Sequence, residues 1–536
     1  MSQVGSRLKR NRVTLISAFL FAILLAGISL ASASPADWPM YRNNPLHTGV
    51  ATDIVAPPLN LKWKQTFGGA VDSSPAVFGS RLYVGSDDGN LYAIDTTTGN
   101  IIWTFNDAGA TLIGCTGVAC PWESSPAVAT VGGQTVVLAG NDINELYAIR
   151  DDGATPFKLW DTTALAVGGF VRSSPVVTTI GGTQVVIFGA AGAVGQLYAL
   201  VAATGGLYPG WGLLNPFTDA GGIGAGPFVS SPAILGQTIF IGDTTNNLYA
   251  VNLGNGVKLW DSQTSFPTPL PGGPIYSSPA VANVVVGGVP TDLVFFGADD
   301  SKLYAAVAAS GALQWSFAVG DTIDSSPAVA VIPNPPPLSA CTPGPTLAVI
   351  FGSKDQNLYA VRASDGTPCW TFPSTGAAPF YSSPTVSGQT VYVGSDDSNV
   401  YAVDINTGTW RWSYPALAPV GDPTVAPNPV VSGTRLYVGS KDNSLYAFEA
   451  LPPTTVTSTV TSTVTSTVTT TIAATTVTTT ETSMHTTTDT VTQTVTLCPA
   501  GPGAIAGFPV EAIIVGMAAG YLALTLARRR RKVSSG

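Results

Sequence analysis

The stretch that decides the fold is Ser73-Ser74-Pro75-Ala76-Val77, followed by Leu82-Tyr83-Val84-Gly85-Ser86-Asp87-Asp88-Gly89-Asn90-Leu91-Tyr92-Ala93-Ile94-Asp95 and then by Gly99 and Trp103. Ser-Ser-Pro recurs with its proline at Pro126, Pro175, Pro232, Pro279, Pro327 and Pro384, and Pro427-Asn428-Pro429 stands in the eighth place. A Leu-Tyr-Ala or Val-Tyr-Ala follows each copy, with its tyrosine at Tyr92, Tyr147, Tyr198, Tyr249, Tyr304, Tyr359, Tyr401 and Tyr446. The spacing of about 45–57 residues is within or just above the range of propeller blades.

Each unit offers four short apolar runs separated by turn residues, which predicts a four-stranded antiparallel blade. The turn between the second and third strands is acidic, as in Asp299-Asp300 and Asp396-Asp397. Asp and Asn tolerate the left-handed backbone region and bond to their own backbone, so we interpret these acids as turn formers. Calcium ligation is the alternative.

The fourth strand of each of the first seven units carries a tryptophan. The eighth unit has no such strand after Tyr446. The tryptophans after the first seven units are Trp103, Trp160, Trp211, Trp260, Trp315, Trp370 and Trp412. The missing strand is at the other end of the chain, where Leu61-Lys62-Trp63-Lys64-Gln65-Thr66-Phe67 has the right pattern. We therefore predict an all-β, eight-bladed propeller over residues 34–452, closed by the strand around Trp63 so that no long edge strand is exposed.

Both ends of the chain have membrane signals. A basic cluster, an uncharged run from Val13 to Leu30 and Ala31-Ser32-Ala33 predict a signal peptide over residues 1–33; an uncleaved signal anchor is the alternative. Residues 504–527 are long enough to span a bilayer, and the basic tail at 528–536 would stay in the cytoplasm. We expect a single-pass membrane protein whose propeller lies outside the cytoplasm.

A Thr-rich stretch at residues 453–500 separates the propeller from the predicted anchor. It begins as a Thr-Val-Thr-Ser repeat and has Glu481 and Asp489 as its charged residues. Such tracts have little bulky apolar side chain to offset the entropy of ordering, so we predict a disordered stalk. The alternation of Thr and Val also suits a β-strand, but about 40 residues without a turn signal exceed a normal strand.

The charge balance argues against nucleic acid as a partner. Between Ser34 and Pro453 the chain has 14 basic and 29 acidic residues. This net negative region should repel phosphate backbones and anionic lipid.

The N-terminal motif makes a family resemblance specific. Asp37-Trp38-Pro39-Met40-Tyr41-Arg42-Asn43-Asn44-Pro45-Leu46-His47-Thr48-Gly49, followed by the repeats, resembles the pyrroloquinoline-quinone-repeat (quinoprotein-like) β-propeller superfamily over about Asp37 to Ala450. That superfamily includes quinoprotein alcohol dehydrogenases and the β-barrel assembly lipoprotein of Gram-negative bacteria. The Thr-rich stalk and basic-ended anchor resemble surface proteins of archaea.

The resemblance implies what a catalytic member would need: a vicinal cystine, a calcium ion bound by Glu, Asn and Asp, and an Asp base. The chain has no adjacent cysteines, and between Ser34 and Pro453 its glutamates are Glu123, Glu145 and Glu449. We therefore predict no cofactor, no metal and no quinone-dependent dehydrogenase activity. With two histidines, His47 and His485, a Ser-His-Asp triad or a zinc site is not expected, and we interpret His47 as structural.

The same resemblance places the first strand of each blade at the central channel. The residue before each Ser-Ser-Pro should then lie at one channel mouth. The candidate ligand site is Asp72, Glu123, Arg172, Tyr276, Asp324 and Tyr381, with Val229 and Ala426 at the two remaining positions. Such a funnel could bind a cation, a sugar or a peptide, and an ordinary solvated rim is the alternative.

Five cysteines in an exported protein suggest disulfides. Cys115 and Cys120 are predicted to close a small loop, Cys341 and Cys369 fall in the same blade, and Cys498 is left over.

The favoured hypothesis is a cell-surface propeller that binds or scaffolds an extracellular protein or polysaccharide, without its own chemistry. The alternatives are a degenerate quinoprotein dehydrogenase or a carboxylate-based hydrolase, and an envelope protein assembly factor. The last would be expected to carry a lipobox cysteine after its signal, and none is present.

Overall fold

The computed structural model describes residues 37–106, 120–219, 226–266, 272–336, 341, 344–415, 427–450, 454–468 and 481–495. The chain divides into two units, residues 1–449 and 450–536, which are described separately.

In the first unit the described residues form eight four-stranded sheets, here called blades 1 to 8. Blade 1 contains β2 (Ala76–Phe78), β3 (Arg81–Ser86), β4 (Asn90–Asp95) and β5 (Ile101–Phe105). Blade 2 contains β6 (Ala127–Val131), β7 (Gln134–Gly140), β8 (Leu146–Asp151) and β9 (Pro156–Asp161). Blade 3 contains β10 (Gly169–Phe170), β11 (Val176–Ile180), β12 (Thr183–Gly192) and β13 (Gln196–Val201), flanked by the short 3-10 helices η1 (Thr163–Leu165) and η2 (Pro209–Leu214). Blade 4 contains β14 (Ala233–Leu235), β15 (Thr238–Gly242), β16 (Leu248–Asn252) and β17 (Lys258–Asp261), followed by α2 (Ser262–Ser265).

In blade 3, β12 lies between β11 and β13, and the two-residue β10 pairs with the end of β12. Blades 5 to 7 have their strands in chain order, as blades 1, 2 and 4 do. Blade 5 contains β18 (Ala280–Val286), β19 (Val289–Ala298), β20 (Lys302–Val307) and β21 (Leu313–Ala318). Blade 6 contains β22 (Ala328–Ile332), β23 (Thr346–Gly352), β24 (Asn357–Arg362) and β25 (Pro368–Pro373). Blade 7 contains β26 (Thr385–Ser387), β27 (Thr390–Gly394), β28 (Asn399–Asp404) and β29 (Trp410–Pro415). Blade 8 contains β30 (Val430–Ser432), β31 (Arg435–Ser440), β32 (Ser444–Ala450) and the N-terminal β1 (Leu59–Thr66).

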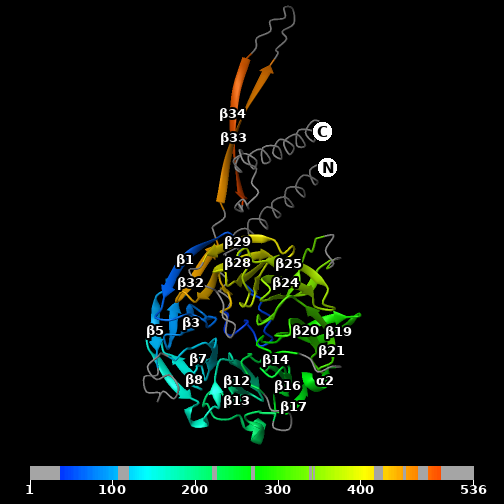
Figure 1. The fold of residues 1–536 in the computed structure, drawn as a ribbon. Helices are drawn as coiled ribbons and strands as arrows, with labels where there is room; N and C mark the ends of the chain where they lie inside the picture. Colours follow the sequence, from blue (N-terminus) through cyan, green and yellow to red (C-terminus); the bar gives the residue numbers. More distant parts are fainter. Residues whose placement is uncertain are drawn as a thin grey trace, which may run out of the picture. The chain divides into compact units, whose positions relative to one another are not determined.

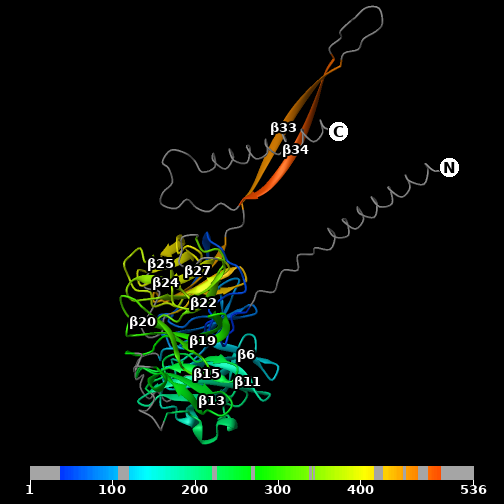
Figure 2. The ribbon, with the colours of Figure 1, turned by 90° about the vertical axis from the view of Figure 1, so that its right-hand side faces the viewer.

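The ring closes as the sequence predicts. β1 pairs with β32, so the first strand of the chain completes the last blade. Lys62 contacts Glu449 at 2.9 Å, and Lys64 contacts Asp442 at 2.8 Å, across this junction. Figure 1 shows the blades succeeding one another around the ring in chain order, and Figure 2 shows the same ring turned by 90°. The eight-bladed propeller of four-stranded antiparallel blades is thus confirmed.

A closed circle of hydrogen bonds explains the Ser-Ser-Pro repeat. In each blade the amide of the second serine donates to the second serine's hydroxyl in the next blade, and Asn428 takes that place in blade 8. The N–O distances around this circle are 2.8–3.1 Å, and its members are Ser74, Ser125, Ser174, Ser231, Ser278, Ser326, Ser383 and Asn428. The Asn428 amide returns to the Ser74 hydroxyl, so the degenerate eighth copy still completes the circle.

The tryptophans join neighbouring blades at the outer side. The indole N–H of Trp315 donates to the Ala363 carbonyl of the next blade at 3.0 Å, and that of Trp63 donates to the Thr96 carbonyl at 3.1 Å. Gly99, with a φ of +76°, turns beside the Trp63 ring, where an added Cβ would lie 2.6 Å from the indole. This packing is the physical reason for the glycine four residues before the next tryptophan.

Blade 3 differs from the prediction of a tryptophan on its fourth strand. Trp211 lies in η2, where Pro209 at the first helical position favours a helical turn over a strand. Its indole still donates to the Leu253 carbonyl of blade 4 at 2.8 Å. The exposed edge of β13 is completed by Asn215, whose side chain both accepts from and donates to the Ala199 backbone, as a strand would.

The turn acids act as predicted for one residue of each pair. Asp88 accepts from the Tyr92 hydroxyl at 2.7 Å and from the Gly68 amide at 2.9 Å. Asp355 accepts in the same way from Tyr359 and Gly320, both at 2.7 Å. Within the turns, the Asn90 and Asn357 backbone amides donate to Asp88 and Asp355, both at 3.1 Å, which confirms these two acids as turn formers. The tyrosine contacts explain the tyrosine of Leu-Tyr-Ala.

The N-terminal motif crosses the ring and contacts six blades; residues 37–50 are called the plug here. Its carbonyls accept from the amide two residues after the proline in blades 1, 2, 4, 5, 6 and 7, at N–O distances of 2.7–2.9 Å. The donors are Val77, Val128, Ile234, Val281, Val329 and Val386. The plug therefore lies along the first strands, on one side of the serine circle. The residues that precede each Ser-Ser-Pro lie on the other side of that circle.

The two faces of the ring are distinct. The turns between second and third strands and the connections between blades lie on one face, here called the mouth face, as in the bond from the Asp87 amide to the Ala70 carbonyl at 2.9 Å. The hairpins between first and second strands lie on the plug face. β1 starts at Leu59, and β32 pairs Glu449 with Arg435, away from the Ser440–Ser444 turn. The propeller's chain ends therefore leave from the plug face.

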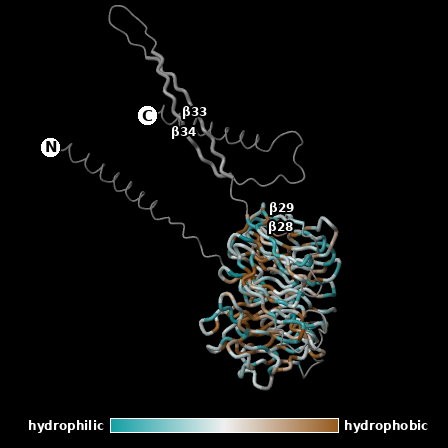
Figure 3. The backbone as a smooth tube through the Cα atoms, turned by 90° about the vertical axis from the view of Figure 1, so that its left-hand side faces the viewer, coloured by the Kyte–Doolittle hydropathy of each residue, from teal (hydrophilic) through white to brown (hydrophobic). Residues whose placement is uncertain are grey.

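The core is apolar and lies between the blades. Tyr83, Leu91, Tyr147 and Ile149 are among the buried residues that pack between neighbouring sheets. Figure 3 shows apolar and polar stretches mixed along the propeller chain. Inner strands such as β3 and β4 are buried along most of their length, whereas the outer strand β5 has both exposed and buried side chains.

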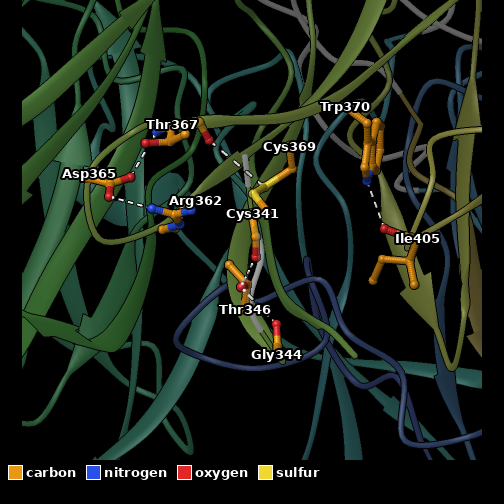
Figure 4. Close-up of a disulfide and its surroundings, with 9 residues drawn as sticks. All are labelled: Cys341, Gly344, Thr346, Arg362, Asp365, Thr367, Cys369, Trp370 and Ile405. Atoms are coloured by element: carbon orange, nitrogen blue, oxygen red, sulfur yellow. Dashed lines mark hydrogen bonds and ion pairs between the residues drawn. A yellow bond between two sulfur atoms is a disulfide. The ribbon is translucent and has the colours of Figure 1, made fainter. Parts of the chain in front are cut away.

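Cys341 and Cys369 form a disulfide in blade 6, shown in Figure 4. It ties the connection between β22 and β23 to β25. Cys120 is also disulfide-bonded, but its predicted partner Cys115 lies outside the described residues, so that pairing stays a prediction.

In the second unit, β33 (Thr454–Val468) pairs antiparallel with β34 (Glu481–Val495). Alternating Val and Thr have high β-propensity, which suits this pairing. The disordered stalk predicted over residues 453–500 stays a prediction. The signal peptide, membrane helix and basic tail predicted at 1–33, 504–527 and 528–536 lie outside the described residues. Within the part that is described, no helix is long and apolar enough to cross a bilayer.

The serine circle gives a stability prediction. Asn428→Ala leaves the buried Ser383 amide without its acceptor, so we expect it to lower the free energy of unfolding by about 1–3 kcal/mol. Thermal unfolding of the full-length protein measures this. Ser80→Ala, at an exposed turn, is the control and should change the midpoint little; equal midpoints for the two variants would contradict the role of the circle.

Candidate functional site

The residue before each Ser-Ser-Pro is positioned by the turn of its own blade. The amide of the first turn residue donates to the carbonyl two residues before the mouth position: Asp142 to Pro121 at 3.1 Å, and Lys354 to Thr322 at 3.0 Å. The same bond forms from Asp299 to Pro274 at 2.9 Å. Each mouth side chain therefore lies beside the first turn residue, and the predicted site gains a second set of residues.

The first cluster spans blades 1 to 3. Arg172 Nε lies 3.2 Å from a Glu123 carboxylate oxygen. The same guanidinium donates from Nε and Nη2 to the two oxygens of Asp142, at 3.1 and 2.6 Å. The Arg172 guanidinium thus contacts two carboxylates. It binds both oxygens of Asp142, at shorter distances than its contact with Glu123. The Arg172 guanidinium also lies 5.3 Å from the ring of Phe170.

Charge and burial act together on Glu123, whose side chain is only 13% exposed. Burial is the main cause that raises the pKa of Glu123 to about 8, with the charges of Asp142, Asp72 and Asp87 adding to it and Arg172 opposing it. Glu123 therefore keeps a proton at neutral pH.

The second cluster spans blades 5 to 7. Lys354 Nζ lies 3.2 Å from Asp324 and 5.3 Å from the centre of the Tyr381 ring. The Asp324 side chain is 4% exposed. Burial raises the pKa of Asp324 to about 7, with Lys354 opposing and Asp299 reinforcing the shift. Burial also raises the pKa of Tyr276, and Asp299 and Asp324 add to it.

The predicted site is thus two clusters and not one. Blades 2 and 6 are four steps apart in a ring of eight, so Glu123 and Asp324 lie on opposite sides of the axis; Figure 1 shows β7 and β24 across the ring from each other. Val229 is half-buried, and Ala426 lies outside the described residues.

Sequence reasoning missed Asp142 and Lys354 and misassigned Asp299. It treated the acids of the second turn as equivalent turn formers, whereas Asp300 holds the turn through Gly272 and Tyr304, and Asp299 acts on the mouth cluster. The repeat could have indicated these residues, because Asp142 and Lys354 occupy the same repeat position as Asp299, the first residue of the turn.

His47 is structural, as predicted. Its ring is buried in the plug, and Nδ1 lies 3.2 Å from the Pro279 carbonyl. Burial, and then the charge of Arg42, lower the pKa of His47 to about 3, so the ring stays neutral. Arg42 donates to the Pro384 carbonyl at 2.6 Å, and the Tyr41 hydroxyl contacts Ser326 Oγ at 2.9 Å. These side chains bind the plug to the Ser-Ser-Pro segments.

The comparisons agree with this architecture. The family model described as "Outer membrane protein assembly factor BamB" matches residues 60–209, 159–330 and 333–452. The chain belongs to the PQQ-repeat β-propeller family. No curated protein sequence matches the chain closely enough to serve as a relative.

Solved structures share the fold of this PQQ-repeat propeller at low identity. Quinohemoprotein alcohol dehydrogenase from Comamonas testosteroni aligns with a TM-score of 0.59 at 16% identity, over 78% of this chain and 81% of its own. A europium-containing methanol dehydrogenase aligns with a TM-score of 0.56 at 15% identity, over 77% and 98%. Quinohemoprotein alcohol dehydrogenase ADHIIG from Pseudomonas putida HK5 aligns with a TM-score of 0.55 at 16% identity, over 77% and 80%. These likenesses show the fold alone.

The mouth residues do not fit a quinone and its calcium ion. Of the glutamates between Ser34 and Pro453, Glu145 bonds to Tyr147 and Thr163, and Glu449 pairs with Lys62 on the plug face. Glu123 is left, and it contacts Arg172 in a cluster that raises its pKa. Among the described residues, no group of three or more His, Cys, Asp or Glu could hold a metal ion.

The raised pKa of Glu123 predicts a pH-dependent stability. The folded protein keeps a proton that the unfolded chain releases between about pH 4.5 and 8, so the contribution of Glu123 is full below pH 4.5 and is lost as pH rises to 8. Glu123→Gln removes this loss and should stabilise the protein by up to ~4 kcal/mol at pH 8, with little effect at pH 4. Thermal unfolding at both pH values measures the difference.

Glu449→Gln is the matched control, with the opposite sign. A hydrogen bond from Lys62 is the main cause that lowers the pKa of Glu449, so its contribution is present above the unfolded pKa and is lost as pH falls. This variant should be less stable than the wild type at pH 8. The same sign for both glutamines at pH 8 would refute the assignment.

Proposed function

We propose that this protein is a cell-surface binding module that holds an extracellular protein at the mouth face of its propeller, without a reaction of its own. The repeat itself carries the proposal. Positions that hold the ring keep one residue type from blade to blade, as Ser74 and Ser326 do, whereas the mouth positions change from Asp to Glu, Arg, Val and Tyr. Ring closure does not need the mouth side chains, so their charge and burial call for another reason.

The connections between blades also favour the mouth face as the binding surface. From β5 to β6 the chain uses residues 106–126, and from β17 to β18 it uses 262–279, whereas β21 to β22 needs only 319–327. On the plug face, β2 and β3 are joined by Gly79 and Ser80 alone, and the connection from β22 to β23, residues 333–345, is the longer exception. Long and variable connections on one face of a rigid scaffold are where binding residues concentrate.

The charge of the clusters favours a basic partner. Their acids outnumber their bases, with Asp72, Asp87, Glu123, Asp142, Asp299 and Asp324 against Arg172 and Lys354. A protein surface bearing Lys and Arg complements this mouth and would be attracted to it over several ångströms. The sequence signals at 1–33 and 504–527 support display outside the cell membrane, with the Thr-rich unit between propeller and anchor.

Capture from envelope extracts tests the binding surface. At pH 8.5, where Glu123 and Asp324 are mostly ionised, full-length protein with Asp72→Asn, Glu123→Gln and Asp324→Asn should bind its partner at least about tenfold more weakly than the wild type, because the attracting carboxylates are gone. Asp152→Asn with Asp292→Asn and Asp365→Asn removes the same charge away from the mouth and should retain binding. Equal loss in both variants, or capture of a polysaccharide instead of a protein, would overturn the proposal.

Titration with pyrroloquinoline quinone tests the absence of dehydrogenase chemistry. We expect no saturable quenching of tryptophan fluorescence, with or without calcium, because the mouth clusters are built from ion pairs and not from open metal ligands. A saturable, calcium-dependent change would favour the dehydrogenase alternative.

An envelope assembly role is the second candidate, and the match to the family model described as an outer membrane protein assembly factor favours it. Deleting the gene separates the two. An assembly factor would lower the abundance of many other envelope proteins, whereas a binding module would leave them unchanged.

A further inference from the structure

Two carboxyl groups at the mouth face share their bases with a second acid, and both lie at junctions between blades. Arg172 reaches from blade 3 to Glu123 and Asp142 of blade 2. Lys354 of blade 6 contacts Asp324 of the same blade, which faces Asp299 of blade 5.

The geometry leaves each cluster under-neutralised. Asp142 takes two donors from the Arg172 guanidinium, and Glu123 lies 3.2 Å from the Nε atom of the same group. Asp324 meets Lys354 at 3.2 Å, and the Asp299 carboxyl group is close enough to share a hydrogen bond with Asp324. At this degree of burial, one negative charge beside one base is favourable. A second negative charge is unfavourable, because it shares that one base and little water reaches it.

We propose that the mouth face carries a proton-linked switch in two copies, at Glu123 and at Asp324, which exchange protons near neutral pH and so set the charge offered to a ligand. Deprotonation adds two negative charges on opposite sides of the ring axis. The surroundings agree with this, since the pKa of Glu123 is about 8 and that of Asp324 about 7.

Each copy has charged and titratable neighbours on more than one blade. Glu123 faces Arg172 of blade 3, Asp142 of its own blade, and Asp72 and Asp87 of blade 1. Asp324 lies near the base Lys354 and the acid Asp299. The tyrosines Tyr276 and Tyr381, whose pKa values are raised, are also close, and Asp321 and Asp396 act on Tyr381. Burial is the main cause of proton retention in both copies, the neighbouring acids add to it, and Arg172 and Lys354 oppose it.

Proton release by the protein alone is the direct test. Between pH 6 and 9, the folded full-length protein should release two more protons than the Glu123→Gln/Asp324→Asn variant in a potentiometric titration. Asp152→Asn/Asp292→Asn should match the wild type over that interval. Equal release by the wild type and the mouth variant would overturn the proposal.

Arg172→Gln gives a second reading that does not remove a carboxyl group. Without its base, Glu123 should hold its proton more tightly, so one of the two protons should leave at a higher pH than in the wild type. An unchanged or lower midpoint would also overturn the proposal. Far-UV circular dichroism at pH 7 confirms that each variant is folded before its protons are counted.

The consequence for binding rests on the proposed function and has its own measurement. A hexalysine peptide should bind the wild type several-fold more tightly at pH 8.5 than at pH 6 at constant ionic strength, and the double mouth variant should lose this dependence. Equal affinity of the wild type at both pH values would break the link between switch and ligand. Failure of the peptide to bind at either pH would count against the proposed basic partner, while the proton count still decides the switch.

Discussion

The hydrogen bonds that pass from the second serine of one blade to that of the next fix where every blade begins. They form a closed circle, so each first strand is held in register with both neighbours at once. A ring of separate sheets has few backbone bonds between its parts, and its neighbours touch mainly through apolar side chains, which set no direction. The serine circle supplies that direction, because a hydroxyl accepts from one amide at one place.

The other features of the ring depend on this alignment. The plug can bond to the amide two residues after the proline in six blades because those amides lie at one level. The indoles reach the next blade's carbonyls, as from Trp370 to Ile405 at 2.8 Å, because neighbouring blades keep a constant offset. Closure by β1 then links the first strand of the chain to the last, so that unravelling from either end must break the same blade.

The mouth face uses the same frame for a different purpose. Ring closure uses the two serines and the proline of each repeat. The residue before them is held in place by the same backbone, but its side chain is not needed for the serine circle. Glu123 and Asp324 use that freedom to place carboxyl groups where each meets a second acid and one base. The stability lost by burying these acids is tolerated because eight blades share the work of holding the fold, and this is the arrangement expected of residues kept for binding.

The sequence by itself determined the number of blades, the strand that closes the ring and the residues that precede each Ser-Ser-Pro. These follow from local repeats, whose chemistry is the same in every copy. It could not show that Trp211 would lie in a helical turn, that Asp299 and Asp300 would have separate roles, or that Asp142 would share Arg172 with Glu123. Such contacts join residues of different blades or opposite sides of one turn, and they arise only when the ring brings those side chains within hydrogen-bonding distance. Tertiary structure thus decided the pairing of charges, because electrostatic energy depends on distances and burial that no repeat pattern contains.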